Sequence, residues 1–330
     1  MVAFAAAAFS AKGILIKLSY QHSVDTITLL ALRMIFAAPF FLALAWWTGS
    51  KTSATPLTRR EKWAVVIAGT LGYYFGSLFD FMGLQYITVA LERLVLFLFP
   101  TFVVLYSALF AGYRVGRRDV FALVASYFGI ALAFVNDLTT QQTNVVLGTL
   151  LVLLSSISYA AYLIQSDKLI KRVGSIRYAS LAALSATVGI LAQFFLTTPA
   201  SVLVTQPAPV YGWALLMAIV ATVMPITLTV AGIRRIGSSR ASMVATVGPV
   251  VTIFFGYLFL GEPITPLQLC GAAFVVIGVL VIATKPDATS QLLSRNPCAS
   301  RHSYVPAQQS LSHNPVLRDI RTSLYSKSNR

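Results

Sequence analysis

Six ionisable residues lie in segments that are otherwise apolar, and they are the residues of this chain best suited to chemistry. They are Lys12, Lys17, Arg33, Asp80, Glu92 and Arg93. On insertion scales an ionisable side chain costs about 2.5 to 3.5 kcal/mol at the centre of a membrane-spanning helix, so such groups indicate function by default. Four cations against two carboxylates predict a site that favours a solute bearing a carboxylate or a phosphate over a plain cation.

Specific roles follow from charge and depth. We expect Lys12 and Arg33 to hold the anionic group of a solute, with Asp80 as the proton-linked or gating carboxylate. Glu92 and Arg93 are expected to take part in gating or coupling. The alternative is structural, and in it Arg33 pairs with Asp80. Glu92 would then pair with Arg93 or a lysine, or the long side chains would reach toward the membrane surface.

The composition places these residues in a polytopic membrane protein. Of the 330 residues, 57% are hydrophobic and 11% are charged, whereas a soluble domain has about 25% charged residues. The Lys and Arg residues behind the net charge of +15 lie in short loops and a tail, so no basic face for a nucleic acid is expected. Cys270 and Cys298 have no metal-ligand spacing. No metal or cofactor is expected.

Ten runs of about 20 apolar residues predict ten transmembrane helices. The loops after even-numbered spans are rich in Lys and Arg, and the alternate loops are nearly free of both. The positive-inside rule then predicts that both termini are cytoplasmic. The predicted spans cover 2–20, 27–48, 63–85, 88–111, 117–136, 145–166, 178–197, 210–233, 239–260 and 267–284.

The second half of the chain repeats the first at an offset of 149 residues. The segment 83–129 aligns without a gap on 232–278, with glycines and prolines in register. Because five spans per copy is an odd number, the second copy must enter the membrane from the opposite side. We therefore predict an all-α integral membrane fold of two inverted five-helix repeats, 1–137 and 138–285, followed by a disordered basic cytoplasmic tail, 286–330. Inverted repeats build secondary transporters, with the solute site between the halves.

Matched helix interruptions predict where that site lies. Gly76 in span 3 aligns with Pro225 in span 8, and Pro100 in span 4 aligns with Pro249 in span 9. Paired interruptions of this kind indicate a binding site, and proline permits a helix to bend.

The same predicted site includes polar residues next to the interruptions. Tyr73 and Thr222 align with one another, and Thr229 is the counterpart of Asp80, so all are candidates to contact solute. Alternatively, Gly72 and Gly76 form only a close-packing face, and the polar residues only bond between helices.

Several motifs resemble the drug/metabolite transporter superfamily and, within it, the EamA family of ten-span permeases. The resemblance rests on Lys17, LRM at 32–34, GLQYI at 83–87, Pro100, LFLGEPIT ending at Thr265, and the apolar run 271–282. The first repeat departs from it, with Tyr113 where the second repeat has Glu262. The resemblance implies a ten-span fold and transport of small solutes, without naming the solute.

We therefore predict a gradient-driven secondary transporter of the bacterial inner membrane. It would export a small anionic or zwitterionic metabolite, such as an amino acid. The chain has no phosphate-binding G-x-x-x-x-G-K-[ST] motif, and its histidines lie away from any paired carboxylates, so neither ATP hydrolysis nor other enzyme activity is expected. The expected partners are a small-molecule solute and the lipid bilayer, with protons as coupling ion and a homodimer kept as possible partners. The rival is a membrane scaffold or sensor that acts through the basic tail.

Overall fold

The computed structural model describes residues 2–51, 57–110, 115–139, 144–236, 244 and 246–283, and all regular structure within these ranges is helical. The chain divides into two units, Met1–Thr284 and Lys285–Arg330. The predicted tail, 286–330, lies outside the described residues. The helices below therefore all belong to the first unit.

Eight helical segments are long and apolar enough to cross a membrane, and two shorter apolar helices, Gly248–Leu260 and Pro266–Val281, follow them among the described residues. The helices are α1 (Val2–Tyr20), α2 (Thr26–Lys51), α3 (Arg59–Gly69), α4 (Gly76–Gly83), α5 (Val89–Leu96), α6 (Phe99–Phe110), α7 (Arg117–Thr139), α8 (Val145–Val173), α9 (Ser175–Thr197), α10 (Ala208–Ala218), α11 (Met224–Ile236), α13 (Gly248–Leu260) and α14 (Pro266–Ala283). Two π-helical segments, η1 (Thr70–Phe75) and η3 (Ile219–Val223), and a 3₁₀ turn, η2 (Ala200–Leu203), complete the set.

Predicted and observed helices differ mainly where the backbone is irregular. The run predicted as one span at 63–85 consists of α3, η1 and α4, joined by the π turn. The run predicted at 88–111 is divided into α5 and α6 by a turn at Phe97 and Leu98. Pro100 explains this division, because its nitrogen carries no hydrogen for the carbonyl four residues earlier. For the run predicted at 239–260, the structure describes a helix only from Gly248.

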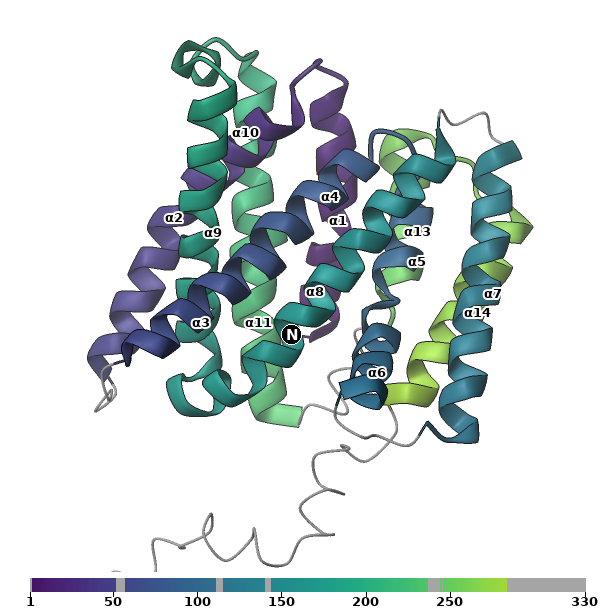
Figure 1. The fold of residues 1–330 in the computed structure, drawn as a ribbon. Helices are drawn as coiled ribbons and strands as arrows, with labels where there is room; N and C mark the ends of the chain where they lie inside the picture. Colours follow the sequence, from purple (N-terminus) through teal and green to yellow (C-terminus); the bar gives the residue numbers. More distant parts are fainter. Residues whose placement is uncertain are drawn as a thin grey trace, which may run out of the picture. The chain divides into compact units, whose positions relative to one another are not determined.

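Helix α1 lies at the centre of the unit and packs against α10, α11, α13 and α5. The pairs α2 with α9 and α7 with α14 lie on either side of it (Figure 1). The α7–α14 contact is close because both helices have glycine there: a Cβ on Gly129 would lie 2.4 Å from the carbonyl oxygen of Gly271. Small residues at a crossing let two backbones approach in this way.

Large apolar side chains cover the surface of the unit, as expected for helices that contact lipid. Trp46 and Leu196 are among the most exposed, and no water-soluble fold would gain from leaving so many such residues uncovered. The α1–α2, α4–α5 and α9–α10 connections lie along the upper edge of the view in Figure 1. We call this edge the upper end. The interior, by contrast, holds the charged residues singled out above.

Candidate functional site

The centre of the candidate site is a buried lysine between two carboxylates. Lys12 Nζ on α1 lies 2.6 Å from Asp80 Oδ2 on α4 and 3.4 Å from Glu92 Oε1 on α5. The three side chains are 9%, 2% and 1% exposed, so water solvates their charges very little. Burying a charge costs much free energy, and pairing it with an opposite charge offsets that cost. One ammonium therefore ties together three helices, and two carboxylates compete for it.

Glycine makes room for this arrangement on α1. A Cβ on Gly13 would lie 3.4 Å from Glu92 Oε2 and 3.4 Å from a methyl group of Val89. Asp80 Oδ1 accepts no hydrogen bond from any residue that the structure describes. An acceptor left free in a buried site is costly. The carboxyl pair thus retains capacity to bind a proton or a donor group.

Arg33 does not pair with Asp80 in the described residues, contrary to the structural alternative. Its Nε donates to Thr222 Oγ1 at 3.0 Å and its Nη1 to Ser77 Oγ at 3.4 Å. The guanidinium also lies 5.3 Å from the centroid of the Phe81 ring, within the range of a cation–π contact. Arg33 therefore links α2 to α4 and to the π-helical segment η3, and its full charge is not neutralised by a contacting carboxylate.

Arg93 points to a different group of neighbours from its sequence neighbour Glu92. Its Nη2 donates to Ser10 Oγ at 3.3 Å, and its guanidinium lies 4.7 Å from the Phe9 ring centroid and 5.6 Å from that of Phe97. Ser10 Oγ in turn lies 3.0 Å from the carbonyl oxygen of Gly248 at the start of α13. Arg93 therefore joins α5 to α1 and α13 without an ion-pair partner among the described residues.

The two π-helical segments lie at equivalent positions of the sequence repeat. Segment η1 begins at Thr70 and η3 begins at Ile219, which is 149 residues later. In η3, Thr222 Oγ1 donates to the carbonyl oxygen of Met217 and accepts from Arg33. π-Helical turns are rare and are frequent at functional sites. The interruptions predicted at Gly76 and Pro225 thus lie beside irregular backbone. Gly76 directly follows η1, and Pro225 is the second residue after η3.

The glycines of η1 and α4 have different surroundings. A Cβ on Gly72 would lie 2.4 Å from Tyr162, so this glycine is required for helix packing. A Cβ on Gly76 would meet only the carbonyl oxygen of Leu71, at 3.5 Å. The packing alternative therefore holds for Gly72 and does not explain Gly76.

Serines on α8 supply hydrogen bonds to the irregular helices. Ser158 Oγ donates to the carbonyl oxygen of Leu71 in η1, and Ser155 Oγ to that of Gly76. Ser156 Oγ donates to the carbonyl oxygen of Leu96 at 3.2 Å, which is the group that Pro100 leaves without an amide donor. Side chains that satisfy freed backbone groups are what allow broken helices inside a membrane.

Pro100 and Pro249 occupy the first turns of α6 and α13, and these helices begin at Phe99 and Gly248, again 149 residues apart. Proline is well tolerated there because the first amides of a helix have no intrahelical acceptor. The two prolines therefore start helices in the structure. The prediction that they permit bending stays a prediction.

The remaining predicted residues do not join the charged cluster. Tyr73 packs edge-on against Tyr162, with ring centroids 5.4 Å apart. Thr229 is half-buried on α11, and Pro225 is buried on the same helix. Lys17 lies nearer the upper end and pairs with Glu262 Oε1 at 3.0 Å. With Lys17 so neutralised, three cations and two carboxylates remain among the six residues first singled out.

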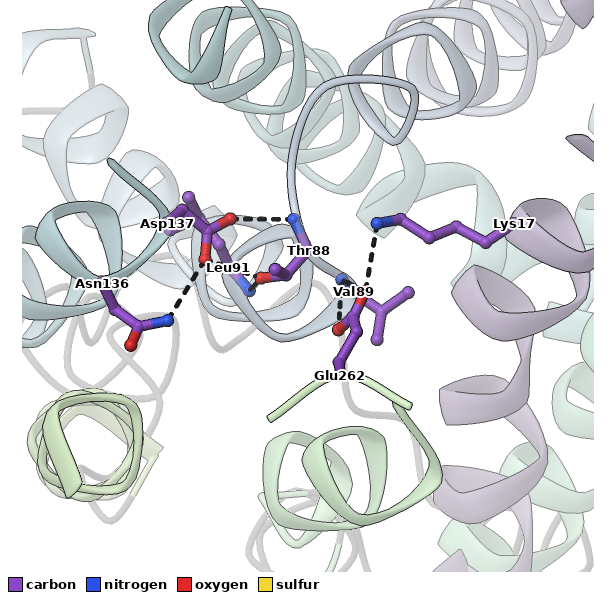
Figure 2. Close-up of polar contacts among 7 residues, drawn as sticks. All are labelled: Lys17, Thr88, Val89, Leu91, Asn136, Asp137 and Glu262. Atoms are coloured by element: carbon purple, nitrogen blue, oxygen red, sulfur yellow. Dashed lines mark hydrogen bonds and ion pairs between the residues drawn. The ribbon is translucent and has the colours of Figure 1, made fainter. Parts of the chain in front are cut away.

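Two carboxylates hold the N-terminus of α5 (Figure 2). Asp137 accepts from the backbone nitrogen of Thr88 at 2.8 Å and from its hydroxyl at 2.9 Å. Both oxygens of Glu262 accept from the backbone nitrogen of Val89, at 3.3 and 3.2 Å. Negative charge is favourable at a helix N-terminus. Helix α5 carries Glu92 and Arg93, so these carboxylates position the helix that completes the central cluster.

Sequence reasoning missed Ser10, Ser77, Asp137 and the role of Glu262. Asp137 and Glu262 lie at helix ends, where a carboxylate is unremarkable by itself. The departure of the first repeat at Tyr113 also argued against a shared role for Glu262. Ser77 lies three residues before Asp80, on the same face of the helix, and this spacing is the signal that could have found it. Ser10 lies two residues before Lys12, a spacing that places two side chains on different faces, so no spacing marked it.

Comparisons with known proteins agree with this architecture. The model of the EamA-like transporter family matches residues 1–135 and again 146–284. The uncharacterized transporter YcbK of Bacillus subtilis is 33% identical over 282 residues, covering 82% of this chain and 88% of its own. The uncharacterized transporter YyaM of the same organism is 23% identical over 247 residues, covering 74% and 79%.

A likeness to solved structures concerns the fold. One solved crystal structure superposes with a TM-score of 0.59 at 18% identity, and the match covers 90% of this chain and 97% of that chain. The helical fold, the two matches to one family model and the identity to YcbK lead to one conclusion. This chain is an integral multi-pass membrane protein and belongs to the EamA-like transporter family.

Proposed function

We propose that this protein is a gradient-driven secondary transporter that exports a small anionic or zwitterionic metabolite, such as an amino acid. The observation that carries the proposal is the ammonium of Lys12, buried between Asp80 and Glu92. Two carboxylates that share one cation can take up a proton when another anion competes for that cation, because the released carboxylate loses its counter-charge. Such a group supports coupling to protons without ATP.

The architecture proposed with it is ten spans in two inverted five-helix repeats. Support comes from the 149-residue offset between the starts of η1 and η3, and between the starts of α6 and α13. In this arrangement the upper end faces outward and both termini are cytoplasmic, in a bacterial inner membrane. Arg33 bridges the repeats by bonding Ser77 of the first and Thr222 of the second. A residue that contacts both halves at their π turns is well placed to hold an anionic group.

No catalytic step is proposed for the protein. The carboxylates of the cluster are engaged with a lysine, and the geometry offers charge pairing and proton exchange rather than bond cleavage. Tyr73, Thr222 and Thr229 are proposed to contact solute beside Lys12 and Arg33. The helix interruptions at Gly76, Pro225, Pro100 and Pro249 are proposed to let the helices bend as the solute site opens to one side of the membrane and then to the other.

The test begins with the solute. Metabolites in the medium of overexpressing and deletion cells are compared, and the solute that differs is offered to inside-out vesicles under an imposed pH gradient. We expect uptake that depends on the protein, collapses with a protonophore and persists without ATP. Uptake that requires ATP, or no difference in any solute across varied nutrients, would overturn the proposal.

A further inference from the structure

The upper end of the unit holds an open hollow of about 600 Å³ beside the Lys17–Glu262 ion pair. The hollow is separate from the buried cluster, although α1 carries the lysine of each. Its lining is polar as well as apolar and combines residues of both repeats. Among the lining residues are Lys17, Gln21 and Leu84 of the first repeat and Leu260 and Glu262 of the second.

Glu262 is bound in the hollow as a free carboxylate would be. Lys17 Nζ lies 3.0 Å from its Oε1, and the backbone nitrogen of Val89 donates to both oxygens (Figure 2). An ammonium with a backbone amide at the start of a helix is a donor set that recognises carboxylates. The side chains of Lys17 and Glu262 are 19% and 13% exposed, so solute in the hollow can reach them.

The backbone of Glu262 is held by a hydrogen bond that does not involve its side chain. Its own backbone nitrogen is fixed to the carbonyl oxygen of Gly256 at 3.2 Å. Its carboxylate fills space that exists because Gly256 has no side chain, since a Cβ there would lie 3.2 Å from Oε2. A rotation of the side chain alone would vacate the donors, while this backbone bond would still hold the connection between α13 and α14.

We propose that Lys17 and the Val89 amide form a second solute site, specific for carboxylates, in which Glu262 is a tethered competitor. A carboxylate-bearing solute displaces Glu262 and takes its contacts with Lys17 and Val89. In naming this occupant as the transported metabolite, the inference rests on the proposed function. The site itself does not, because binding to Lys17 can be measured without transport.

A purely structural role for Glu262 predicts the opposite effect of its neutralisation. If Glu262 only fastens α5 to α1, its neutralisation loosens the hollow and weakens binding there. If Glu262 is a competitor, its neutralisation removes a rival for Lys17 and strengthens binding. The sign of the effect of Glu262→Gln therefore distinguishes the two roles.

The experiment uses the full chain with Cys270→Ser and Cys298→Ser, purified in nanodiscs, and a reporter cysteine at Gln21→Cys in the hollow. The rate at which a methanethiosulfonate reagent labels the reporter is measured with increasing succinate, and with succinamide as the uncharged match. We expect succinate to slow labelling, with the half-protecting concentration several-fold lower in Glu262→Gln. Lys17→Gln should abolish protection, and succinamide should protect in none of the variants.

Glu61→Gln serves as the matched control, because Glu61 lies at the start of α3 and does not line the hollow. Glu262→Asp is a second variant, for use if Glu262→Gln proves unstable. It keeps the charge but has a shorter side chain, so its half-protecting concentration of succinate should lie between those of the wild type and Glu262→Gln. Protection that falls in Glu262→Gln, or survives Lys17→Gln, would overturn the inference. If the variants protect as expected but the protein transports no solute, the carboxylate site is supported and the proposed transport function is rejected.

Discussion

Lys12 Nζ lies 2.6 Å from Asp80 Oδ2, and this ion pair is shorter than the one between Lys12 and Glu92 in the buried charged cluster. The same ammonium lies 3.4 Å from Glu92 Oε1. The cluster is thus asymmetric, with Asp80 held closely and Glu92 held more loosely. Because both carboxylates depend on one cation, any change at Lys12 or Asp80 redistributes charge across α1, α4 and α5.

Asp80→Asn should eliminate proton-coupled flux. The substitution leaves Lys12 paired with Glu92 alone, so the site loses the carboxylate that would take up the proton. The measurement is solute flux in liposomes under a pH gradient, with Asp25→Asn as the matched control. Asp25 accepts from the backbone nitrogens of Ile27 and Thr28, and asparagine caps a helix equally well. Identical coupled flux in wild type and Asp80→Asn would show that the assigned role is wrong.

Lys12→Met should reduce the free energy of unfolding by about 3 to 5 kcal/mol, because it leaves two buried carboxylates without their cation. The measurement is denaturation of the purified protein in detergent. Adding Asp80→Asn and Glu92→Gln to Lys12→Met should recover most of this loss, since neutral groups no longer need a counter-charge. Flux should not return in the triple variant. A triple variant no more stable than Lys12→Met would indicate that the ion pairs are not the source of the stability.

The burial of the charged residues could be predicted from the sequence. One pairing was also among the predicted alternatives, because Glu92 was paired there with Arg93 or a lysine, and Lys12 is that lysine. The closer contact of Lys12 with Asp80 could not be predicted. Spacing along a helix gives the depth of Lys12, Arg33 and Asp80. Which of them meet depends on how each helix is rotated about its axis, and each residue turns a helix by about 100°. Asp80 faces α1 rather than α2, so it meets Lys12, while Arg33 meets Thr222.

The interruptions were predictable for a different reason. Gly76 and Pro225 align at the repeat offset, and both weaken a helix whatever surrounds them. The structure places a π turn directly before Gly76 and another that ends two residues before Pro225. The serines of α8 that satisfy these turns could not be predicted, because a serine in an apolar run has no distinguishing spacing and its partners lie on other helices.

Gly72→Ala should destabilise the protein by about 1 to 3 kcal/mol, the usual range for overpacking a tight contact. The added Cβ would lie 2.4 Å from Tyr162. Gly76→Ala should leave stability unchanged or raise it by up to about 1 kcal/mol, because alanine favours a helix and the nearest contact is ordinary. If the π turn must rearrange during transport, Gly76→Ala should nevertheless slow flux. Normal flux in a folded Gly76→Ala variant would remove Gly76 from the gating residues.

Ser156→Ala should cost about 1 to 3 kcal/mol, because it leaves the carbonyl oxygen of Leu96 without a donor. In a Pro100→Ala background the cost should be smaller, since residue 100 then carries an amide hydrogen for Leu96. The double-mutant cycle in detergent measures this coupling. Ser126→Ala is the control, because Ser126 Oγ is buried and has no partner among the described residues. Equal losses for Ser156→Ala in both backgrounds would contradict the assignment.

Thr222→Val should raise the KM for the transported solute with a smaller effect on the maximal rate, because it removes the acceptor that orients Arg33 Nε. Thr222→Ser keeps a hydroxyl in the same place and should restore most of the wild-type KM. Valine matches threonine in shape, so a change in packing alone cannot account for a difference between Thr222→Val and the wild type. Arg33→Lys should resemble Thr222→Val, since lysine lacks the planar fork that reaches Thr222 and Ser77 together. If Thr222→Val and Thr222→Ser share the wild-type KM, Arg33 is oriented by other contacts and the solute does not depend on the link between η3 and α2.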